Sequence, residues 1–324
     1  MTAIGRRDFA LGLAALPAAL GVPALAHAGT ETGGTAFGTY WRLLVSDRRQ
    51  ALRAQAVAEA VFADVTAAMS PWDDSSELSR FNAASADRPF VPGTSLTHVA
   101  EAALSLARLT DGAFDPTVGP LVARYGFGPV AGDGPPDWRG VTLEGGALRK
   151  ARSGLTLDLC GIAKGHALDR LAESLRHEGV VDAFLDLGGE MRGLGRHPAG
   201  RNWRSAVARP FAADGAALAV IEPGGLAVAT SGVAEQSYVL AGRRISHLID
   251  PVAAAPVGDG LLSVTVLAPT AMAADGLATA LAAMGPLRGP AWARGRGIPA
   301  FFAIGEPGAV TTRQTGPFAA HRIG

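Results

Sequence analysis

The spacing of apolar positions along the chain predicts four long helices separated by groups of short strands. The helical stretches are rich in Ala and carry apolar positions three or four residues apart, the spacing that gives a helix one buried face. These predicted helices cover residues 49–69, 95–110, 161–179 and 271–284. Short apolar runs bounded by turn residues predict strands; they cover residues 39–45, 140–144, 147–151, 155–159, 184–187, 203–208, 218–221, 226–230, 244–249, 262–268 and 299–304.

The order of these elements indicates the fold class. The predicted strands cluster and pair by hairpins, one of them at the Gly-Gly turn of residues 144–147, and they do not alternate strictly with helices. That order favours an α+β fold, with mixed or antiparallel sheets packed with helices, over a doubly wound sheet. Between the elements we expect a flexible entry at residues 29–36, a polar turn-like segment at 70–82 and a loop rich in Pro and Gly at 129–140.

The first residues have the pattern of an export signal. Arg6 and Arg7 precede a mildly apolar stretch over residues 9–25, which is followed by an Ala-His-Ala cleavage site. A twin arginine before an aromatic residue is typical of the bacterial Tat pathway. An uncleaved membrane anchor is the alternative, but the stretch is short and two prolines interrupt it. We therefore expect a signal peptide at residues 1–28 and one domain at 29–324, periplasmic, soluble and without a transmembrane span.

Charge and cysteine content exclude several classes of protein. Lys plus Arg and Asp plus Glu each number 29 in the 324 residues, so the formal net charge is zero. This balance removes the electrostatic basis for nucleic acid or an anionic membrane as the main partner. The single cysteine, Cys160, excludes an intrachain disulfide and a cysteine-based zinc site. With no basic or histidine neighbour before Lys164, we expect Cys160 to be a small buried residue and not a nucleophile.

An acid and an alcohol stand out in the predicted helix at residues 271–284. Asp275 and Thr279 are four residues apart, and every other residue there is Ala, Gly, Leu or Met. Four residues is about one helical turn, so both oxygens project from the same face. A carboxylate and a hydroxyl aimed into the interior need a partner, and Mg²⁺ prefers oxygen ligands. The pair therefore indicates a hard cation.

A second candidate site lies where the helix at residues 161–179 begins. Residues 157–169 run from a predicted strand through a Gly turn into this helix, with Lys164 in the first turn. Free backbone N–H groups and the positive end of the helix dipole suit a phosphate there. The glycine spacing of a phosphate-binding P-loop is absent. A Gly-capped surface helix explains the segment equally well.

Three further segments combine small and polar residues at the ends of predicted elements. Ser-His-Leu-Ile-Asp-Pro at residues 246–251 ends a strand with His247 beside an Asp-Pro turn. A lone histidine is more often structural, although this position favours a function. Residues 111–120 are dense in Gly, Pro, Asp and Thr, which lets a ligand approach the backbone closely. Residues 229–232, Ala-Thr-Ser-Gly, form a strand end of the same kind.

The order of these segments resembles that of a known family. Residues 69–82, Met-Ser-Pro-Trp-Asp-Asp-Ser-Ser-Glu-Leu-Ser-Arg-Phe-Asn, resemble the first motif of the ApbE family, the FAD:protein FMN transferases. The later motifs are matched in the same order at residues 111–120, 158–169, 187–190, 229–232, 246–251 and 274–280. The match spans residues 36–305, and seven ordered motifs are not expected by chance.

The resemblance implies a T-fold-like α+β architecture that binds FAD and Mg²⁺. It also implies transfer of FMN from FAD to a Thr or Ser hydroxyl of a partner protein, with release of AMP. By position, His247 matches the family's catalytic histidine, while Asp275, Thr279 and the carbonyl of Gly161 match its Mg²⁺ ligands. The implied contacts with FAD are Phe37, Trp72, Ala113, Phe114, Asp115, Asp158, Lys164 and Ile249.

Departures from the family pattern concern the metal and the acceptor. Some members have a second Asp immediately before the metal-binding Thr, where this chain has Ala278, so we expect a weaker site or one that holds more water. Many members have an Arg/Asn/aromatic run where residues 233–236 are Val-Ala-Glu-Gln, which affects acceptor recognition more than FAD binding. Trp72 replaces the usual Tyr and keeps an aromatic platform for stacking.

The resemblance leaves the acceptor and two alternative activities open. For an exported member, the expected acceptor is a flavinylated subunit of a membrane redox complex or the flavoprotein of the nitrous oxide reductase maturation system. Water in place of the acceptor hydroxyl would make the protein an FAD pyrophosphatase that gives FMN and AMP. The third alternative is an exported carrier that binds FAD without cleaving it.

Overall fold

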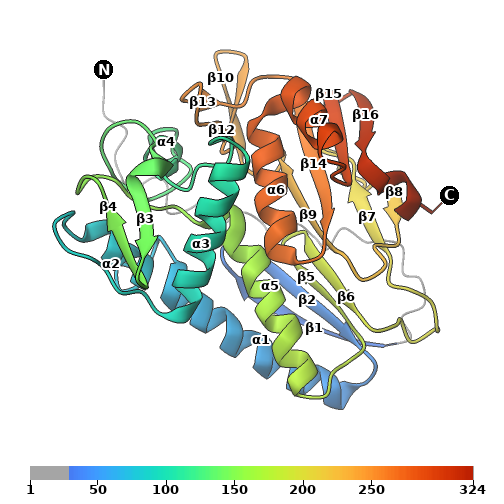
Figure 1. Cartoon of the computed structure of the whole chain (residues 1–324). Coiled ribbons are helices and arrows are strands. Elements are labelled where there is room, and N and C mark those ends of the chain that lie inside the picture. The colour runs from blue at the N-terminus through green and yellow to red at the C-terminus, as the bar shows by residue number, and fades with distance from the viewer. Residues whose placement is uncertain (1–28, 324) are drawn as a thin grey trace.

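The computed structural model describes residues 29–323, and its centre is one eight-stranded sheet. Every neighbouring pair is antiparallel, in the order β1-β2-β5-β6-β9-β14-β15-β16 (Figure 1). The strands are β1 (Thr30–Ala36), β2 (Thr39–Val45), β5 (Ala183–Leu187), β6 (Glu190–Leu194), β9 (Ala227–Gly232), β14 (Leu261–Ala268), β15 (Ala300–Glu306) and β16 (Ala309–Thr315). The α+β class expected from the sequence is confirmed.

Helices cover one face of this sheet. α1 (Arg48–Met69) lies against β1 and β2, and α6 (Ala271–Ala283) lies against β9 and β14. Between them, α5 (Cys160–His177) contacts α1 and α6 and the strands β5 and β6 (Figure 1). α3 (Thr94–Leu109) packs on α1, α5 and α6, and α7 (Gly285–Gly295) packs on α6, β15 and β16. This arrangement places α5 and α6 side by side in the middle of the helical layer.

Smaller elements complete the molecule. In Figure 1, short helices and a hairpin gather at the left of the view beside α3, and further hairpins lie at the top. The first group is α2 (Glu77–Ala83), α4 (Gly119–Arg124) and β3 (Val141–Glu144) with β4 (Ala147–Lys150), preceded by the 3-10 turn Trp138–Gly140. The second is β10 (Ser237–Leu240) with β11 (Arg243–Ser246) and β12 (Ile249–Asp250) with β13 (Ala255–Pro256).

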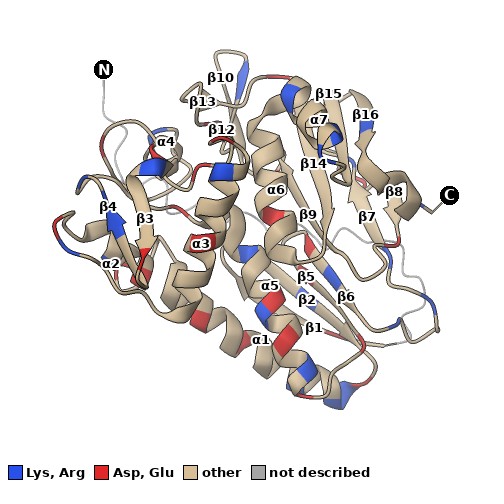
Figure 2. Ribbon diagram, viewed as in Figure 1, with Lys and Arg blue, Asp and Glu red and all other residues tan. Residues whose placement is uncertain are grey.

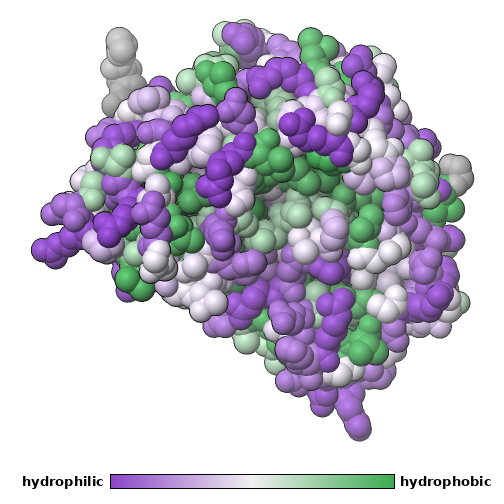
Figure 3. Space-filling view, in the orientation of Figure 1, coloured by the Kyte–Doolittle hydropathy of each residue, from purple (hydrophilic) through white to green (hydrophobic). Residues whose placement is uncertain are grey.

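The other face of the sheet is also covered. β7 (Ser205–Ala208) pairs with β8 (Ala217–Ile221), and the 3-10 turn Gly316–His321 follows β16. Val207 and Ile221 of this hairpin share an apolar cluster with Phe301 of the sheet and Phe318 of the turn. Because both faces are covered, all eight residues of β14 are buried. Figure 3 shows, on the helical side, apolar side chains gathered in a hollow over α6 beside α3.

Residues 29–36 were expected to be a flexible entry, and this expectation is wrong. Residues 30–36 form β1, which pairs with β2 from Thr30 opposite Val45 to Ala36 opposite Thr39. The glycines that suggested flexibility have a packing role here. A Cβ atom on Gly34 would lie 2.9 Å from Nε1 of Trp41, so only glycine lets the indole pack against this strand.

Two further predictions of local structure are wrong. Residues 77–82 of the supposed turn-like segment belong to α2, whose N-cap Ser76 accepts a hydrogen bond from the backbone N–H of Ser79. Residues 155–159 do not form a strand. The side chain of Asn82 forms hydrogen bonds with both backbone groups of Leu157, accepting from the N–H at 2.7 Å and donating to the carbonyl at 2.8 Å. These groups are therefore not available to a neighbouring strand.

The four predicted long helices are confirmed as α1, α3, α5 and α6, and the loop at residues 129–140 is largely confirmed. The predicted strand at 244–249 is divided between β11 and β12. Elements that the pattern did not predict include α4, α7, β6, β10 and β16. Among residues 29–323, no helix has the length and apolar character needed to cross a membrane. The predicted signal peptide at residues 1–28 lies outside the described residues.

Candidate active site

Asp275 is the one charged residue of α6 (Figure 2), and it faces the start of α5. The residue is 2% exposed, and its Oδ2 accepts a hydrogen bond of 2.9 Å from the backbone N–H of Gly165. Gly165 is required at this contact, because a Cβ atom there would lie 2.3 Å from the carbonyl oxygen of Ala271. The two helices therefore pack closely enough for a carboxylate of one to bind the backbone of the other.

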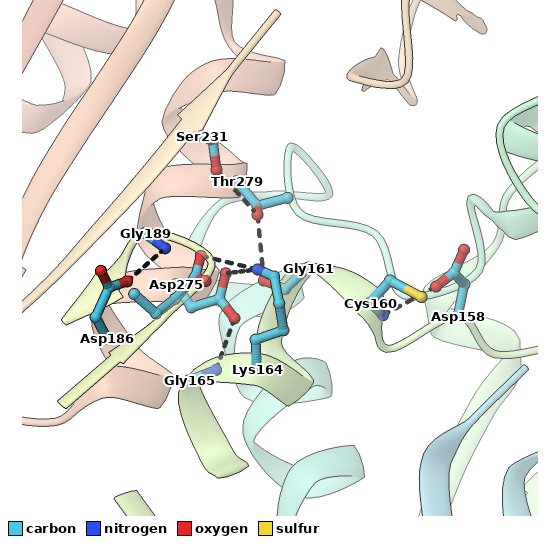
Figure 4. A network of polar contacts seen from close by, with 11 residues as sticks. Asp158, Cys160, Gly161, Lys164, Gly165, Asp186, Gly189, Ser231, Asp275 and Thr279 are labelled. Atoms are coloured by element: carbon cyan, nitrogen blue, oxygen red, sulfur yellow. Dashed lines mark hydrogen bonds and ion pairs between the residues drawn. The ribbon is translucent and has the colours of Figure 1, made fainter. Parts of the chain in front are cut away.

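Thr279 lies one turn after Asp275 and faces the same part of α5. Its Oγ1 donates a hydrogen bond of 3.2 Å to the carbonyl oxygen of Gly161, and Oγ of Ser231 lies 3.4 Å from the same hydroxyl (Figure 4). The structure thus brings together Asp275, Thr279 and Gly161, which the family resemblance assigns to a metal. Their role as ligands stays a prediction.

Lys164, in the first turns of α5, lies between two carboxylates. Its Nζ is 2.8 Å from Oε1 of Glu190 and 3.9 Å from Oδ1 of Asp275. Glu190 is 2% exposed, and its second oxygen, Oε2, has no hydrogen-bond partner among the described residues. Glu190 is the first residue of β6, and β6 begins directly after the Gly188–Gly189 turn.

Burial and charge oppose each other in this group of three. Burial raises the pKa of Asp275, which the charge of Lys164 and the bond from Gly165 partly offset. Burial also raises the pKa of Glu190, to about 8, although Lys164 acts in the opposite direction. Burial disfavours the charged form of Lys164, but the two carboxylates outweigh it and raise the pKa of this amine. The group of Lys164, Glu190 and Asp275 carries one net negative charge when both acids are ionised and is neutral when Glu190 is protonated.

α6 is fixed in position by a carboxylate of α5. Both oxygens of Asp169 accept backbone hydrogen bonds of 2.9 Å, from the N–H groups of Ala271 and Met272 in the first turn of α6. Arg192 of β6 forms an ion pair with Asp169. A negative charge at a helix N-terminus is stabilising, because the free N–H groups and the dipole point toward it. Asp169 therefore sets how α6 lies relative to α5.

The oxygen atoms between α5 and α6 fit a hard divalent cation. Asp275 Oδ1, Thr279 Oγ1 and the carbonyl oxygen of Gly161 are one acidic and two neutral oxygen donors, the kind of ligand that Mg²⁺ prefers. Across residues 29–323, no group of three or more His, Cys, Asp or Glu residues is arranged to hold a metal. An ion held by this set would need further oxygens from phosphate or water, which is the manner in which Mg²⁺ is usually bound.

Asp158 joins the start of α5 to the turn at residues 111–120. Its Oδ1 accepts a hydrogen bond of 2.9 Å from the backbone N–H of Cys160, and its own N–H donates to the carbonyl of Pro116 at 2.7 Å. Asp115 lies inside the same turn, where its Oδ1 accepts bonds from the N–H and the hydroxyl of Thr117. Burial raises the pKa of Asp115, and these two bonds lower it.

The side chains next to Asp115 point into the core. Ala113 and Phe114 are each 4% exposed and belong to different apolar clusters. Their predicted contact with the flavin is not tested by the structure.

Cys160 was expected to be buried, and this expectation is wrong. It is exposed, because it is the first residue of α5, at the N-terminal end that stands beside the polar groups described above.

His247 follows β11 and is bonded to Gln236, the residue before β10. Its backbone N–H and its ring Nδ1 both lie near the carbonyl oxygen of Gln236, at 3.2 and 3.1 Å. A hydrogen on Nδ1 satisfies that carbonyl and leaves Nε2 as the acceptor of the neutral ring. Burial lowers the pKa of His247, the Gln236 bond raises it, and the charge of Lys164 lowers it further. Ile249, two residues later, is 5% exposed.

Phe37 and Trp72 occupy two other turns. Phe37 lies between β1 and β2 with φ of 52°, and its ring meets that of Phe62 edge-on at 5.5 Å. Trp72 is 65% exposed, and its backbone N–H donates to Oγ of Ser70. Within residues 29–323, no hydrogen bond joins these two residues to the Asp275 network. Their predicted stacking on FAD stays a prediction.

The pattern of the sequence did not reveal the roles of Glu190 and Ser231. Both belong to glycine-containing motifs that matched the family, but the sequence offers no indication that Glu190 pairs with Lys164 or that Ser231 reaches Thr279. The one available signal is the rarity of lysine. The chain has only Lys150 and Lys164, and a lysine retained in an arginine-rich chain suggests a need for a compact ammonium group.

The fold and the site define the class of the protein. An antiparallel sheet whose covering helices bring an acid, a hydroxyl and a lysine together near the N-terminal end of α5 is an arrangement suited to an enzyme that handles phosphate groups. The chain belongs to the ApbE family, because the model of that family matches residues 37–302.

Relatives and solved structures agree with this assignment. A FAD:protein FMN transferase from Vibrio cholerae is 39% identical over 254 residues, which is 74% of this chain and 76% of the relative. One of the same description from Klebsiella pneumoniae is 32% identical over 92% of this chain and 91% of its own length. The solved flavin transferase ApbE from Vibrio cholerae superposes with a TM-score of 0.80 at 33% identity, covering 90% of this chain and 99% of that one. The apo flavinyl transferase ApbE of Pseudomonas stutzeri has a TM-score of 0.80 at 28% identity, covering 90% of this chain and 96% of its own.

Proposed function

We propose that this protein transfers FMN from FAD to a Thr or Ser hydroxyl of a partner protein, releases AMP and uses Mg²⁺. Curated relatives at 31–39% identity are named FAD:protein FMN transferases, which supports the flavin transfer. The observation that supports the use of Mg²⁺ and the release of AMP is that Lys164, Asp275, Thr279 and Gly161 lie together between α5 and α6. This set would combine cation ligands with a phosphate-binding amine at one place.

The residues of the site would divide two tasks between them. Asp275, Thr279 and the Gly161 carbonyl would hold Mg²⁺, which when bound neutralises charge on the phosphates. Lys164 and the positive end of the α5 dipole would bind the pyrophosphate of FAD. Positioning and charge neutralisation supply most of the catalysis in phosphoryl transfer.

His247 would act as the base toward the acceptor. In this proposal, Nε2 of His247 takes the proton of the acceptor hydroxyl. The oxygen of that hydroxyl then attacks the phosphorus on the FMN side of FAD. The bond between that phosphorus and the bridging oxygen breaks, and AMP departs with the bridging oxygen and its electron pair. The products are a phosphoester between FMN and the acceptor, AMP, and a proton on His247.

Incubation of the purified protein with FAD, Mg²⁺ and a candidate acceptor tests the proposal. The expected result is a covalently yellow acceptor together with one AMP for each FMN attached. AMP and free FMN without labelled acceptor would identify an FAD pyrophosphatase. Bound FAD that stays intact through repeated additions of Mg²⁺ and acceptor would identify a carrier. Either of these results would contradict the proposal.

Asp275→Asn tests the metal role in the same assay. The amide keeps an oxygen for the N–H of Gly165 and removes the charge, so the fold should persist while transfer falls about 100-fold or more. Asp64→Asn is the matched control, because it removes an exposed carboxylate that lies 3.7 Å from Arg170. Normal transfer by Asp275→Asn at limiting Mg²⁺ would exclude the assigned role.

The acceptor and the location are part of the proposal. A flavinylated subunit of a membrane redox complex or of the nitrous oxide reductase maturation system would need an exported transferase, which the leader at residues 1–28 supports. Replacing Arg6 and Arg7 by Lys should retain the precursor in the cytoplasm and abolish flavinylation of an exported acceptor. Unchanged export of that variant in cell fractionation would contradict Tat transport.

A further inference from the structure

Glu190 is a buried acid for which the proposed reaction has so far no use. Its carboxylate has one partner among the described side chains, Lys164 at 2.8 Å, and Oε2 has none. A buried acceptor without a partner costs about 1–3 kcal/mol. A residue that served only to stabilise the fold would be expected to satisfy both oxygens, so this carboxylate is a candidate for a role in the site.

The chain directs this carboxylate to Lys164 by a rigid turn. β5 and β6 are joined by Gly188 and Gly189, both with positive φ, at 60° and 100°. Positive φ at both central residues is the conformation of the tightest hairpin turns and favours glycine. Asp186 fixes the turn from one side, because its carboxylate accepts from the N–H of Gly189 at 3.1 Å and pairs with Arg42 at 2.9 Å. Glu190 is thus the first side chain after a fixed turn.

The distances around Lys164 show which acid holds it. Nζ is in hydrogen-bond contact with Glu190 at 2.8 Å but remains 3.9 Å from Oδ1 of Asp275. The other oxygen of Asp275 is already bonded to the N–H of Gly165. Oδ1 is therefore the oxygen of Asp275 that a cation could take, and it is available only while Lys164 stays with Glu190.

We infer that Glu190 is a positioning residue for the metal site, which holds the ammonium of Lys164 away from Asp275 and so keeps Oδ1 free for a divalent cation. This inference rests on the proposed function, since it concerns the same cation. Without Glu190, the ammonium would close the remaining distance and pair with Asp275. Lys164 would then compete with the cation for its one acidic ligand.

Binding of Mn²⁺ alone, measured by electron paramagnetic resonance on the purified protein without FAD, tests the inference. Glu190→Gln should weaken Mn²⁺ binding by about 10–100-fold, the loss typical of residues that orient a metal ligand. Glu190→Asp keeps the charge on a shorter side chain and should restore part of the affinity. Glu222→Gln is the control, because it removes a carboxylate that pairs with Arg204 at 2.9 Å outside the site. Thermal unfolding followed by circular dichroism verifies that each variant is folded.

A double-mutant cycle separates positioning from simple loss of negative charge. If Glu190 acts by holding Lys164, its replacement should have no effect once Lys164 is gone, so Lys164→Met and the Lys164→Met/Glu190→Gln double variant should bind Mn²⁺ equally. An equal loss of affinity on both backgrounds would overturn the inference, because it would mean that Glu190 acts through its charge alone. Wild-type affinity in Glu190→Gln would overturn it as well.

The outcomes also distinguish the inference from the function on which it rests. FMN transfer by the wild-type protein, together with unchanged Mn²⁺ binding in Glu190→Gln, would overturn the role of Glu190 and leave the proposed function intact. A wild-type protein that neither binds Mn²⁺ nor transfers FMN would overturn both.

Discussion

At the scale of residues, the site is defined by a few polar groups placed among small apolar ones. Asp275 and Thr279 are the polar side chains of α6, and both bond to the backbone of α5, at Gly165 and Gly161. Each of these four residues has its hydrogen-bond partner on the other helix. Single substitutions here should therefore change chemistry more than stability, provided that the replacement keeps the hydrogen bond.

The pH dependence of transfer should report on His247. Burial lowers the pKa of this imidazole, so the neutral base persists at a lower pH than the ordinary histidine value of about 6.5. The transfer rate should therefore rise with pH along an acidic limb whose midpoint lies below about 6.5. His247→Gln should lower the rate by about 10²–10⁴-fold and remove this limb. An unchanged acidic limb in this variant would assign the limb to another group.

At the scale of elements, the proposed reaction would depend on how closely α5 and α6 approach. Gly165 and the first turn of α6 are in contact, and Asp169 of α5 binds the N–H groups of Ala271 and Met272. The two helices come from segments more than a hundred residues apart in the chain. Their register therefore sets the distance between Lys164 and Asp275.

Gly165→Ala should force these helices apart. The added methyl would lie 2.3 Å from the carbonyl oxygen of Ala271, so we expect a loss of about 1–3 kcal/mol in the free energy of unfolding and a lower transfer rate. Gly295→Ala in α7 is the matched control, because nothing lies within 4 Å of a Cβ atom there. The control should be neutral or slightly stabilising. Denaturant unfolding of both variants measures the difference, and equal stability would contradict the tight contact.

The same elements show which features of the fold and the site could be predicted from the sequence, and why the other features could not. The long helices were readable because their apolar period is local, and the proximity of Asp275 and Thr279 followed from helical spacing. β1 was missed because its glycines contribute through Trp41, which belongs to another strand. The supposed strand at residues 155–159 was wrong because a distant side chain, Asn82, takes its hydrogen bonds. The pairing of Glu190 with Lys164 depends on tertiary contacts that no local pattern records.

At the scale of the whole molecule, the helical layer contains a buried histidine, next to Gly165 in the chain, whose side chain faces α3 and should make the stability of the fold depend on pH. His166 of α5 is 5% exposed, and its Nε2 lies 2.9 Å from Oγ of Ser95 in α3. Burial lowers the pKa of this imidazole to about 4, and the nearby His98 and Arg170 add to the effect. The folded state thus prefers the neutral ring, while the unfolded chain takes up the proton near pH 6.5.

The stability of the fold should follow from this difference. The contribution of His166 is fully present above about pH 6.5 and is lost as the pH falls toward 4, by an amount on the order of 3 kcal/mol. His166→Gln should flatten the dependence of unfolding free energy on pH in this window. The exposed His177 offers a control, and His177→Gln should keep the wild-type slope. Parallel slopes for all three proteins would show that His166 is not the source.

The central claim is that the oxygens between α5 and α6 hold the divalent cation that accompanies FAD. A crystal structure of the protein with FAD and Mn²⁺, with the ion located by its anomalous scattering, tests this claim most directly. The account predicts one Mn²⁺ bound by Asp275, Thr279 and the carbonyl of Gly161, with oxygens of the pyrophosphate completing its shell. Mn²⁺ bound elsewhere, or FAD bound with Lys164 paired to Asp275 and no ion between the helices, would contradict it.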